Sequence, residues 1–396
     1  MQIAIIDADI VGKKKHRFPN LACMKISSYY KNKGDSVILK TDYEKLDKYD
    51  KVFISKVFTS TPVPDGILSL PNVEYGGTGF FYDKATPLPY DIEHSKPDYH
   101  LYDDWVNDAI SKGTKQSEFT YYTDYSIGFL TRGCFRQCDF CVNRNKKKCV
   151  AHSPLYEFMD EERPKLCFLD DNFFACPDWE RLISPVLESG KRFQFKQGLD
   201  ERLLTKDKIQ KLSTWKYDGE VIFAFDNIED RKLIISKLQL IRNTVPEWNR
   251  ELKFYVFCGF DKENKYDRRF WEKDIADMFE RIRILKSFGC KPYLMRYEEV
   301  YKSEYSSFYA AVAAWCNQPG MFRSFTFRLF TQCRGMRRNG YKKYKRDVAG
   351  YLTDIGVKGS EWRAMEQVEN DFPNIASEYF DFTGKPVSKD EWLGVV

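Results

Sequence analysis

Short apolar runs alternate with a helix-like segment over the first sixty residues. Gln2–Asp7 is an apolar run that ends in an acid, and two more β-rich runs follow at residues 36–40 and 51–55. Between them, residues 20–33 place apolar side chains at helical spacing and stop at Gly34. The alternation predicts a small Rossmann-like parallel-sheet domain with both faces covered by helices.

The pattern loosens between about residues 60 and 125. Six prolines and the segment at residues 76–79, which holds three glycines, mark turns and irregular chain there. We therefore expect residues 1–120 to form the first domain and a connecting segment.

A second alternation of apolar runs and charged, helix-like segments begins after residue 120. It predicts a partial (β/α)6 TIM-like barrel over residues 121–300. The six runs lie at residues 126–131, 165–169, 192–196, 221–225, 253–258 and 292–296. Five of them end in polar clusters, and in such barrels the chemistry lies at the carboxyl ends of the strands.

The last hundred residues change composition twice, and we expect residues 301–396 to form a mainly helical C-terminal extension. Residues 322–346 contain nine Lys and Arg, no acid, and several interleaved phenylalanines and tyrosines. Such a stretch can follow a phosphate backbone and stack on bases. The alternative is a solvated helical face with aromatic residues in the core, and both interpretations stay open.

Composition limits the class of protein. The chain has 396 residues, of which 43% are hydrophobic, and a formal net charge of +5. The length predicts several domains or one large α/β barrel, and the mild charge permits an anionic ligand or nucleic acid without requiring one. No apolar run reaches the length of a membrane span, so we expect a cytoplasmic protein without a membrane partner. In a reducing compartment, clustered cysteines indicate metal ligands before disulfides.

Three of the eleven cysteines cluster in a Cys-x₃-Cys-x₂-Cys motif directly after an apolar run: Cys134, Cys138 and Cys141. Three thiolates from one loop can bind three corners of a [4Fe–4S] cluster and leave one iron open for a substrate. Zinc is the alternative, with Cys149 and His152 as the nearest further ligands. The other eight cysteines are expected to be small buried hydrophobic residues.

The three cysteines, with the aromatic Phe140 before the last of them, resemble the signature loop of the radical S-adenosylmethionine (SAM) superfamily. The resemblance covers about residues 122–297. It implies a [4Fe–4S] cluster that binds SAM at its open iron and cleaves it reductively to a 5′-deoxyadenosyl radical, which abstracts hydrogen from a substrate. It also implies an electron donor such as a reductase, flavodoxin or ferredoxin.

The same resemblance implies SAM contacts at the ends of the expected strands. The segment Asp170-Asp171-Asn172 stands where the superfamily binds the SAM amino group, and oxygen acceptors suit an ammonium donor. The remaining cofactor contacts implied by position are Phe140, Gln197, Asp200, Asp226 and Gly259.

The first domain resembles the small cobalamin-binding domain that precedes many radical SAM cores. Asp9 stands where that family has its lower axial histidine, so cobalt ligation through histidine is not expected. Cobalamin bound without a histidine and a domain that only contacts the substrate both stay open.

The sequence therefore predicts a radical SAM enzyme that acts on an unidentified small molecule, peptide or nucleic-acid base. The reaction subtype stays open between methylation, methylthiolation, rearrangement and hydrogen abstraction. The alternative is a non-catalytic iron–sulfur or zinc protein that binds nucleic acid through residues 322–346.

Overall fold

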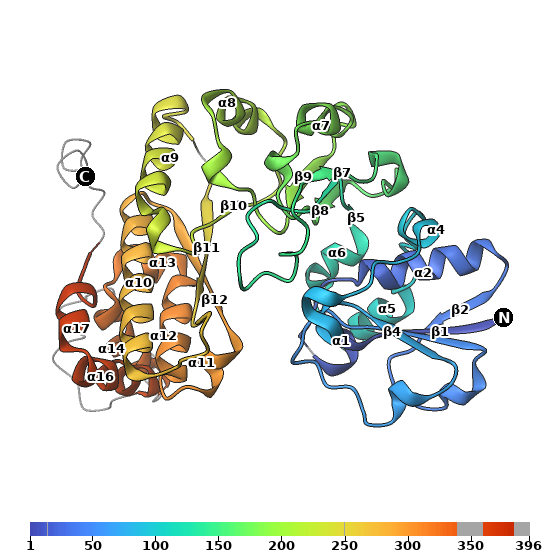
Figure 1. Ribbon diagram of the computed structural model, residues 1–396, viewed down its shortest axis with the longest axis horizontal. Helices are drawn as coiled ribbons and strands as arrows, with labels where there is room; N and C mark the ends of the chain where they lie inside the picture. The colour runs from blue at the N-terminus through green and yellow to red at the C-terminus, as the bar shows by residue number, and fades with distance from the viewer. Residues whose placement is uncertain (14, 249, 339–358, 384–396) are drawn as a thin grey trace. The chain divides into compact units, whose positions relative to one another are not determined.

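The computed structural model describes residues 1–13, 15–248, 250–338 and 359–383 (Figure 1). The chain forms two compact units. The N-terminal unit comprises residues 1–198 and 215–218, and the C-terminal unit comprises the rest. This division differs from the boundaries expected near residues 120 and 300, because the N-terminal unit combines the opening sheet with three strands of the expected barrel.

The N-terminal unit opens with a parallel sheet in the strand order β2-β1-β3-β4. Its strands are β1 (Gln2–Asp7), β2 (Ser36–Leu39), β3 (Lys51–Ser55) and β4 (Val73–Gly76). Ile3 and Ile5 pack in one hydrophobic cluster, whereas Ala4 and Ile6 pack in another. This is the alternation of a strand with both faces covered. The three strands expected here are confirmed, and β4 lies in a stretch that we expected to be irregular.

Helix α2 (Leu21–Asn32) contacts three strands of this sheet. It begins where Asn20 Oδ1 accepts hydrogen bonds from the main-chain nitrogens of Ala22 and Cys23. The other α-helices described in this unit are α1 (Ala8–Gly12), α3 (Thr78–Phe81), α4 (Tyr90–Glu93), α5 (Asp103–Ser111), α6 (Thr120–Thr123) and α7 (Trp179–Glu188).

A second parallel sheet in the N-terminal unit has the order β5-β8-β9. Its strands are β5 (Tyr125–Gly128), β8 (Lys165–Phe168) and β9 (Arg192–Phe195). Fully buried rings of Phe168, Phe193 and Phe195 form its core. A short antiparallel hairpin of β6 (Thr131–Arg132) and β7 (Val150–Ala151) follows β5 in the chain.

The C-terminal unit contains a third parallel sheet, of order β10-β11-β12, and most of the long helices. Its strands are β10 (Val221–Ala224), β11 (Leu252–Cys258) and β12 (Lys291–Arg296). Its described helices are α8 (Lys206–Thr214), α9 (Arg231–Thr244), α10 (Arg268–Ser287), α11 (Glu298–Lys302), α12 (Ser306–Cys316), α13 (Pro319–Ser324), α14 (Phe327–Arg338), α16 (Ser360–Asp371) and α17 (Pro373–Tyr379).

A ring cluster joins the helices of this unit. The centroids of Phe279, Phe308, Phe327 and Phe380 lie 5.4 to 6.0 Å apart. The helices α12 to α14, α16 and α17 confirm the helical character expected after residue 300 for the described part. None of the helices within the described ranges is both long and apolar enough to cross a bilayer.

The six strands expected for a barrel are present, but they form two three-stranded sheets. Within the described residues, no strand ladder joins β9 to β10. Within the N-terminal unit, Phe193 N at the edge of β9 donates to Lys216 O, and Asp218 N donates to Phe193 O. A mixed α/β fold with parallel sheets is observed, whereas one continuous barrel sheet is not.

Candidate functional site

The three clustered cysteines lie on the loop between β6 and β7, which we call the cysteine loop (residues 133–149). The main-chain nitrogen of Cys134 donates to Lys146 O over 3.1 Å, so the loop closes on itself. Gly133 has a φ of 95°, and a Cβ at this position would lie 2.0 Å from Lys148 O. Only glycine fits where the two ends of the loop meet.

Main-chain N–H groups donate to two of the three sulfur atoms. The main-chain nitrogens of Arg136 and Asn143 each donate over 3.4 Å, to the Sγ atoms of Cys134 and Cys141 respectively. These two thiols and that of Cys138 are half-buried. Donors of this kind stabilise negative charge on a sulfur that binds a metal.

The donor set of the loop fits a [4Fe–4S] cluster, since thiolates are the usual ligands of such clusters. In the part of the chain that the structure describes, however, no three Cys, His, Asp or Glu side chains are gathered into a metal site. The three thiolates of a [4Fe–4S] cluster bind three different irons, so they would not form a site for one metal ion.

Asp170 fixes the chain that leads into the cysteine loop. Its Oδ1 accepts hydrogen bonds from the nitrogen and the hydroxyl of Thr131, both at 2.6 Å, and its Oδ2 accepts from Leu130 N at 3.2 Å. The side chain is fully buried, and burial raises the pKa of Asp170 to about 7. The contacts of this residue are internal to the protein.

The next two residues contact the cysteine loop itself. Asp171 Oδ2 accepts from Gly133 N and its Oδ1 from Asn143 Nδ2, both over 2.7 Å. Asn172 Nδ2 donates to Cys134 Sγ over 3.4 Å. The structure thus brings the Asp170-Asp171-Asn172 segment together with the cysteines, and a contact with the SAM amino group stays a prediction.

Phe140 is half-buried, and its main chain is bound by the segment after α3. The hydroxyl of Tyr82 donates to Phe140 O over 2.6 Å. Arg144 Nε pairs with Asp83 Oδ2 at 2.7 Å and holds the pKa of Asp83 below its usual range. The contacts of Tyr82 and Asp83 with the loop could not be predicted from the sequence, because the two residues lie about sixty residues before the loop and belong to no motif.

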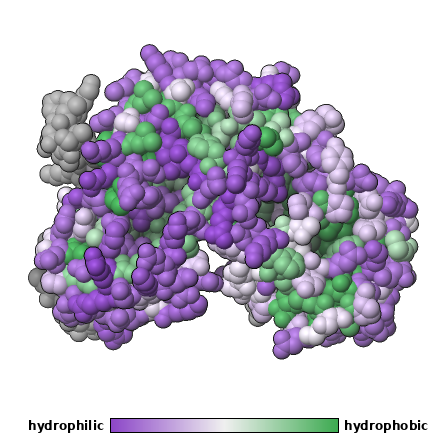
Figure 2. All heavy atoms as spheres, viewed as in Figure 1, coloured by the Kyte–Doolittle hydropathy of each residue, from purple (hydrophilic) through white to green (hydrophobic). Residues whose placement is uncertain are grey.

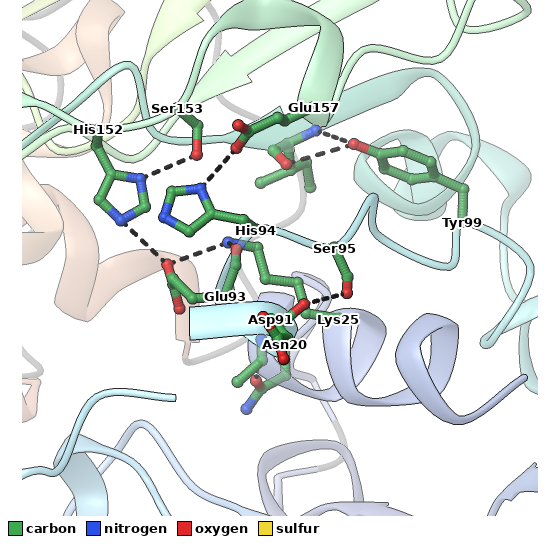
Figure 3. A network of polar contacts seen from close by, with 12 residues as sticks. Asn20, Lys25, Asp91, Glu93, His94, Ser95, Tyr99, His152, Ser153 and Glu157 are labelled. Carbon is green, nitrogen blue, oxygen red and sulfur yellow. Dashed lines mark hydrogen bonds and ion pairs between the residues drawn. The ribbon is translucent and has the colours of Figure 1, made fainter. Parts of the chain in front are cut away.

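A polar network lies next to the base of the hairpin (Figure 3). Lys25 Nζ and His152 Nε2 lie 3.1 and 3.4 Å from the same oxygen of Glu93, and His94 Nδ1 lies 2.8 Å from Glu157 Oε2. The two imidazoles stack with centroids 5.1 Å apart. Burial lowers the pKa of His152 to about 4, so it is neutral at pH 7. The network joins α2 and the end of α4 to the chain after β7.

The ligands that a zinc site would add have separate partners. The Cys149 thiol is buried and donates to Asn172 O over 3.2 Å, and burial raises its pKa to about 12. His152 belongs to the network with Glu93. Within the described residues these two side chains are not gathered with the three cysteines into a metal site, and zinc stays the alternative. Seven of the eight remaining cysteines are buried as expected, and the side chain of Cys333 lies outside the described residues.

The opening sheet does not fit a cobalamin held through residue 9. Asp9 is 1% exposed, its Oδ2 accepts from Val57 N over 2.7 Å, and its Oδ1 accepts from the Thr61 hydroxyl. A Cβ on Gly12 would lie 2.8 Å from Thr61 Cγ2, so the turn after β1 packs closely on the loop after β3. Asp9 is thus a structural residue here.

Apolar side chains gather on the surface of the N-terminal unit, at the lower right of Figure 2. Near the carboxyl ends of β3 and β4 the exposed apolar residues are Val57, Phe58, Tyr75 and Phe81, and the rings of Tyr75 and Phe81 stack with centroids 5.6 Å apart.

Of the predicted SAM contacts, Gln197 also lies in the N-terminal unit, where it follows β9 and is exposed.

The C-terminal unit contains the other three predicted contacts, described here by themselves. Asp200 is 6% exposed, and its Oδ1 accepts from Arg202 Nε over 2.7 Å. Asp226 Oδ1 accepts from Phe257 N over 3.0 Å, and burial raises the pKa of Asp226. Gly259 N donates to the Asp274 carboxylate.

Glu201 is a further buried carboxyl that the sequence analysis missed. It is fully buried, its Oε1 has no hydrogen-bond partner, and its Oε2 accepts from Ala224 N over 3.4 Å. Burial and the neighbouring Asp200 raise its pKa to about 8. Its position after a strand end is the only signal in the sequence that could have pointed to it.

The described part of the basic aromatic stretch packs in the core. Phe322, Phe327 and Phe330 are buried, and Arg328 pairs with Glu369 and Asp381. These rings are not available to stack on bases. Residues 339–346 of the stretch lie outside the described residues.

Comparisons with known proteins gave only distant structural likenesses. No protein-family model and no curated protein matches the chain. The radical SAM methyltransferase TsrM from Kitasatospora setae, solved with cobalamin and a [4Fe–4S] cluster, is 10% identical with a TM-score of 0.48, and 74% of each chain is covered.

Two structures of the cobalamin-dependent SAM radical enzyme OxsB are also similar. The form with aqua-cobalamin is 12% identical with a TM-score of 0.34, and the match covers 98% of this chain and 57% of that one. The apo form is 11% identical with a TM-score of 0.31, at coverages of 74% and 49%. At TM-scores below 0.5, these likenesses assign no function to the chain.

Proposed function

We propose that the chain is a radical SAM enzyme. The observation that carries this proposal is the Cys-x₃-Cys-x₂-Cys loop, which begins after β6, a few residues beyond the carboxyl end of β5, and is held by the turn after β8. The carboxyl edge of a parallel sheet is where α/β folds bind their ligands. Cys134, Cys138 and Cys141 would bind three irons of a [4Fe–4S] cluster.

With three protein ligands, a fourth iron stays open for SAM. The bound cluster would supply the electron that cleaves SAM to a 5′-deoxyadenosyl radical for hydrogen abstraction or group transfer. The chain holds the cysteine thiolates with main-chain N–H donors and positions their loop through Asp170 and Asp171.

SAM contacts from the ends of the other strands are part of the proposal. They comprise the exposed Gln197, and Asp200, Asp226 and Gly259 of the C-terminal unit, and the half-buried Phe140 of the cysteine loop is proposed as a further contact. Because Asp9 is engaged internally, the proposal for the opening sheet is cobalamin bound without that residue as a ligand, or a contact with the substrate alone. The electron donor is proposed to be a reductase, flavodoxin or ferredoxin.

Iron and sulfide analysis after anaerobic reconstitution tests the proposal. About four irons and four sulfides per chain are expected in the wild type. A variant with all three cysteines of the loop replaced by alanine should retain neither. Zinc in place of iron, or equal iron in both proteins, would contradict the proposal.

A further inference from the structure

The turn after β8 holds the cysteine loop at both ends. Asp171 accepts from Gly133 N, before the first cysteine, and from Asn143 Nδ2, after the last. The main-chain oxygen of Asn172 accepts from the Cys149 thiol, where the loop ends. Two consecutive residues thus join the entry, the middle and the exit of the loop.

Asn172 also contacts a sulfur directly. Its side chain is 4% exposed, and its Nδ2 lies 3.4 Å from Cys134 Sγ. The same sulfur accepts from Arg136 N at 3.4 Å. Cys134 Sγ therefore accepts from two N–H donors, one from the main chain and one from a buried side-chain amide.

We infer that Asn172 is a positioning residue that raises the reduction potential of the cluster through its hydrogen bond to Cys134, while Asp171 holds the loop closed around the cluster. The inference rests on the proposed function. It gives Asp171 a role different from the SAM contact expected from the sequence, because both of its side-chain oxygens already bind the loop, and it adds a role for Asn172 through its Nδ2 atom.

The physical reason is electrostatic. Reduction adds one electron to the cluster, and part of its charge resides on the ligating sulfurs. An N–H dipole aimed at a sulfur stabilises that added charge, and it acts strongly in a buried site where water does not screen it. Removing the donor should therefore make the cluster harder to reduce.

The test is a redox titration of the reconstituted protein, followed by electron paramagnetic resonance. Asn172→Leu, which keeps the branched shape and loses the donor, should have a more negative potential than the wild type. Asn172→Asp should be more negative still, because it adds charge. The control is Asn72→Leu, which removes a half-buried amide that donates to Leu46 O and Tyr49 O, away from the loop, and should leave the potential unchanged.

Equal potentials in the wild type and Asn172→Leu would overturn the inference. So would an unchanged potential combined with a weaker response to SAM, since that result would make Asn172 a SAM contact. If Asn172→Leu and Asn172→Asp both lose iron, Asn172→Gln decides. Retained iron supports the amide donor, and lost iron overturns it. A wild type without any cluster would instead overturn the proposed function.

Asp171→Ala tests the second half of the inference. It should lose iron to a chelator several times faster than the wild type, because Gly133 and Asn143 are no longer joined. A wild-type rate of iron loss would overturn the role given to Asp171.

Discussion

The hydroxyl of Tyr82 donates a 2.6 Å hydrogen bond to the main-chain oxygen of Phe140, one residue before the last cysteine of the loop. Tyr82 follows α3 and has a positive φ of 49°, which is uncommon for a tyrosine. Asp83 and Arg144 form an ion pair beside it. The chain after β4 therefore helps to hold the cysteine loop.

Tyr82→Phe should weaken this attachment. Loss of one partly buried hydrogen bond should lower the free energy of unfolding by about 1 kcal/mol. It should also speed the loss of iron from the reconstituted protein, as measured with a chelator. Tyr75→Phe, which changes an exposed tyrosine ring of the same unit, is the control. Identical behaviour of the two variants would contradict the attachment.

Cys138→Ala should abolish stable cluster binding and leave the fold intact. Cys138 is half-buried, so the free energy of unfolding of the apoprotein should change by less than about 1 kcal/mol. Iron content and the visible absorption of the cluster should fall to background. Cys290→Ala, at a buried cysteine of the C-terminal unit, should keep its iron. Iron retained by Cys138→Ala would argue against the ligand set.

His152 should make stability depend on acid. Its pKa is about 4 in the folded protein and about 6.5 in the unfolded chain, so the unfolded chain binds the proton first as pH falls. Between pH 7 and pH 4 the wild type should lose up to ~3 kcal/mol more than His152→Gln. Urea unfolding at several pH values measures this. Parallel pH profiles of the two proteins would refute the neutral, buried imidazole.

Glu201 should act in the opposite direction. Its folded pKa of about 8 lies above its unfolded value of about 4.5, so its contribution to stability is complete below pH 4.5 and is lost as pH rises to 8. Glu201→Gln should gain on the wild type by up to ~4 kcal/mol between pH 5 and pH 8. A stability difference that does not change with pH would show that the carboxyl is ionised throughout.

Local patterns predicted the strands well and their assembly less well. The run Ile3-Ala4-Ile5-Ile6 is apolar on both faces and rich in β-branched isoleucine, so its identity as a buried strand follows from the residues alone. β4 was missed because Val73–Gly76 is short and its neighbourhood is rich in turn residues. The binding of Lys216 and Asp218 to the β9 edge is indicated by no local pattern.

The candidate site divides in the same way. The spacing of Cys134, Cys138 and Cys141 is local, so the sequence could indicate a cluster loop. The partners of the loop are distant in the chain: Asp171 binds Gly133 across 38 residues, and Tyr82 binds Phe140 across 58. A polar residue at a strand end can contact a ligand or a neighbouring loop, and only the three-dimensional structure distinguishes the two.

The most direct test of the central claim combines electron paramagnetic resonance with product analysis on one anaerobic sample. The protein is reconstituted with iron and sulfide, reduced with dithionite, and examined with and without SAM. The account predicts a [4Fe–4S]⁺ signal that SAM perturbs, together with slow formation of 5′-deoxyadenosine by mass spectrometry. A cluster signal that ignores SAM, with no 5′-deoxyadenosine formed, would contradict it.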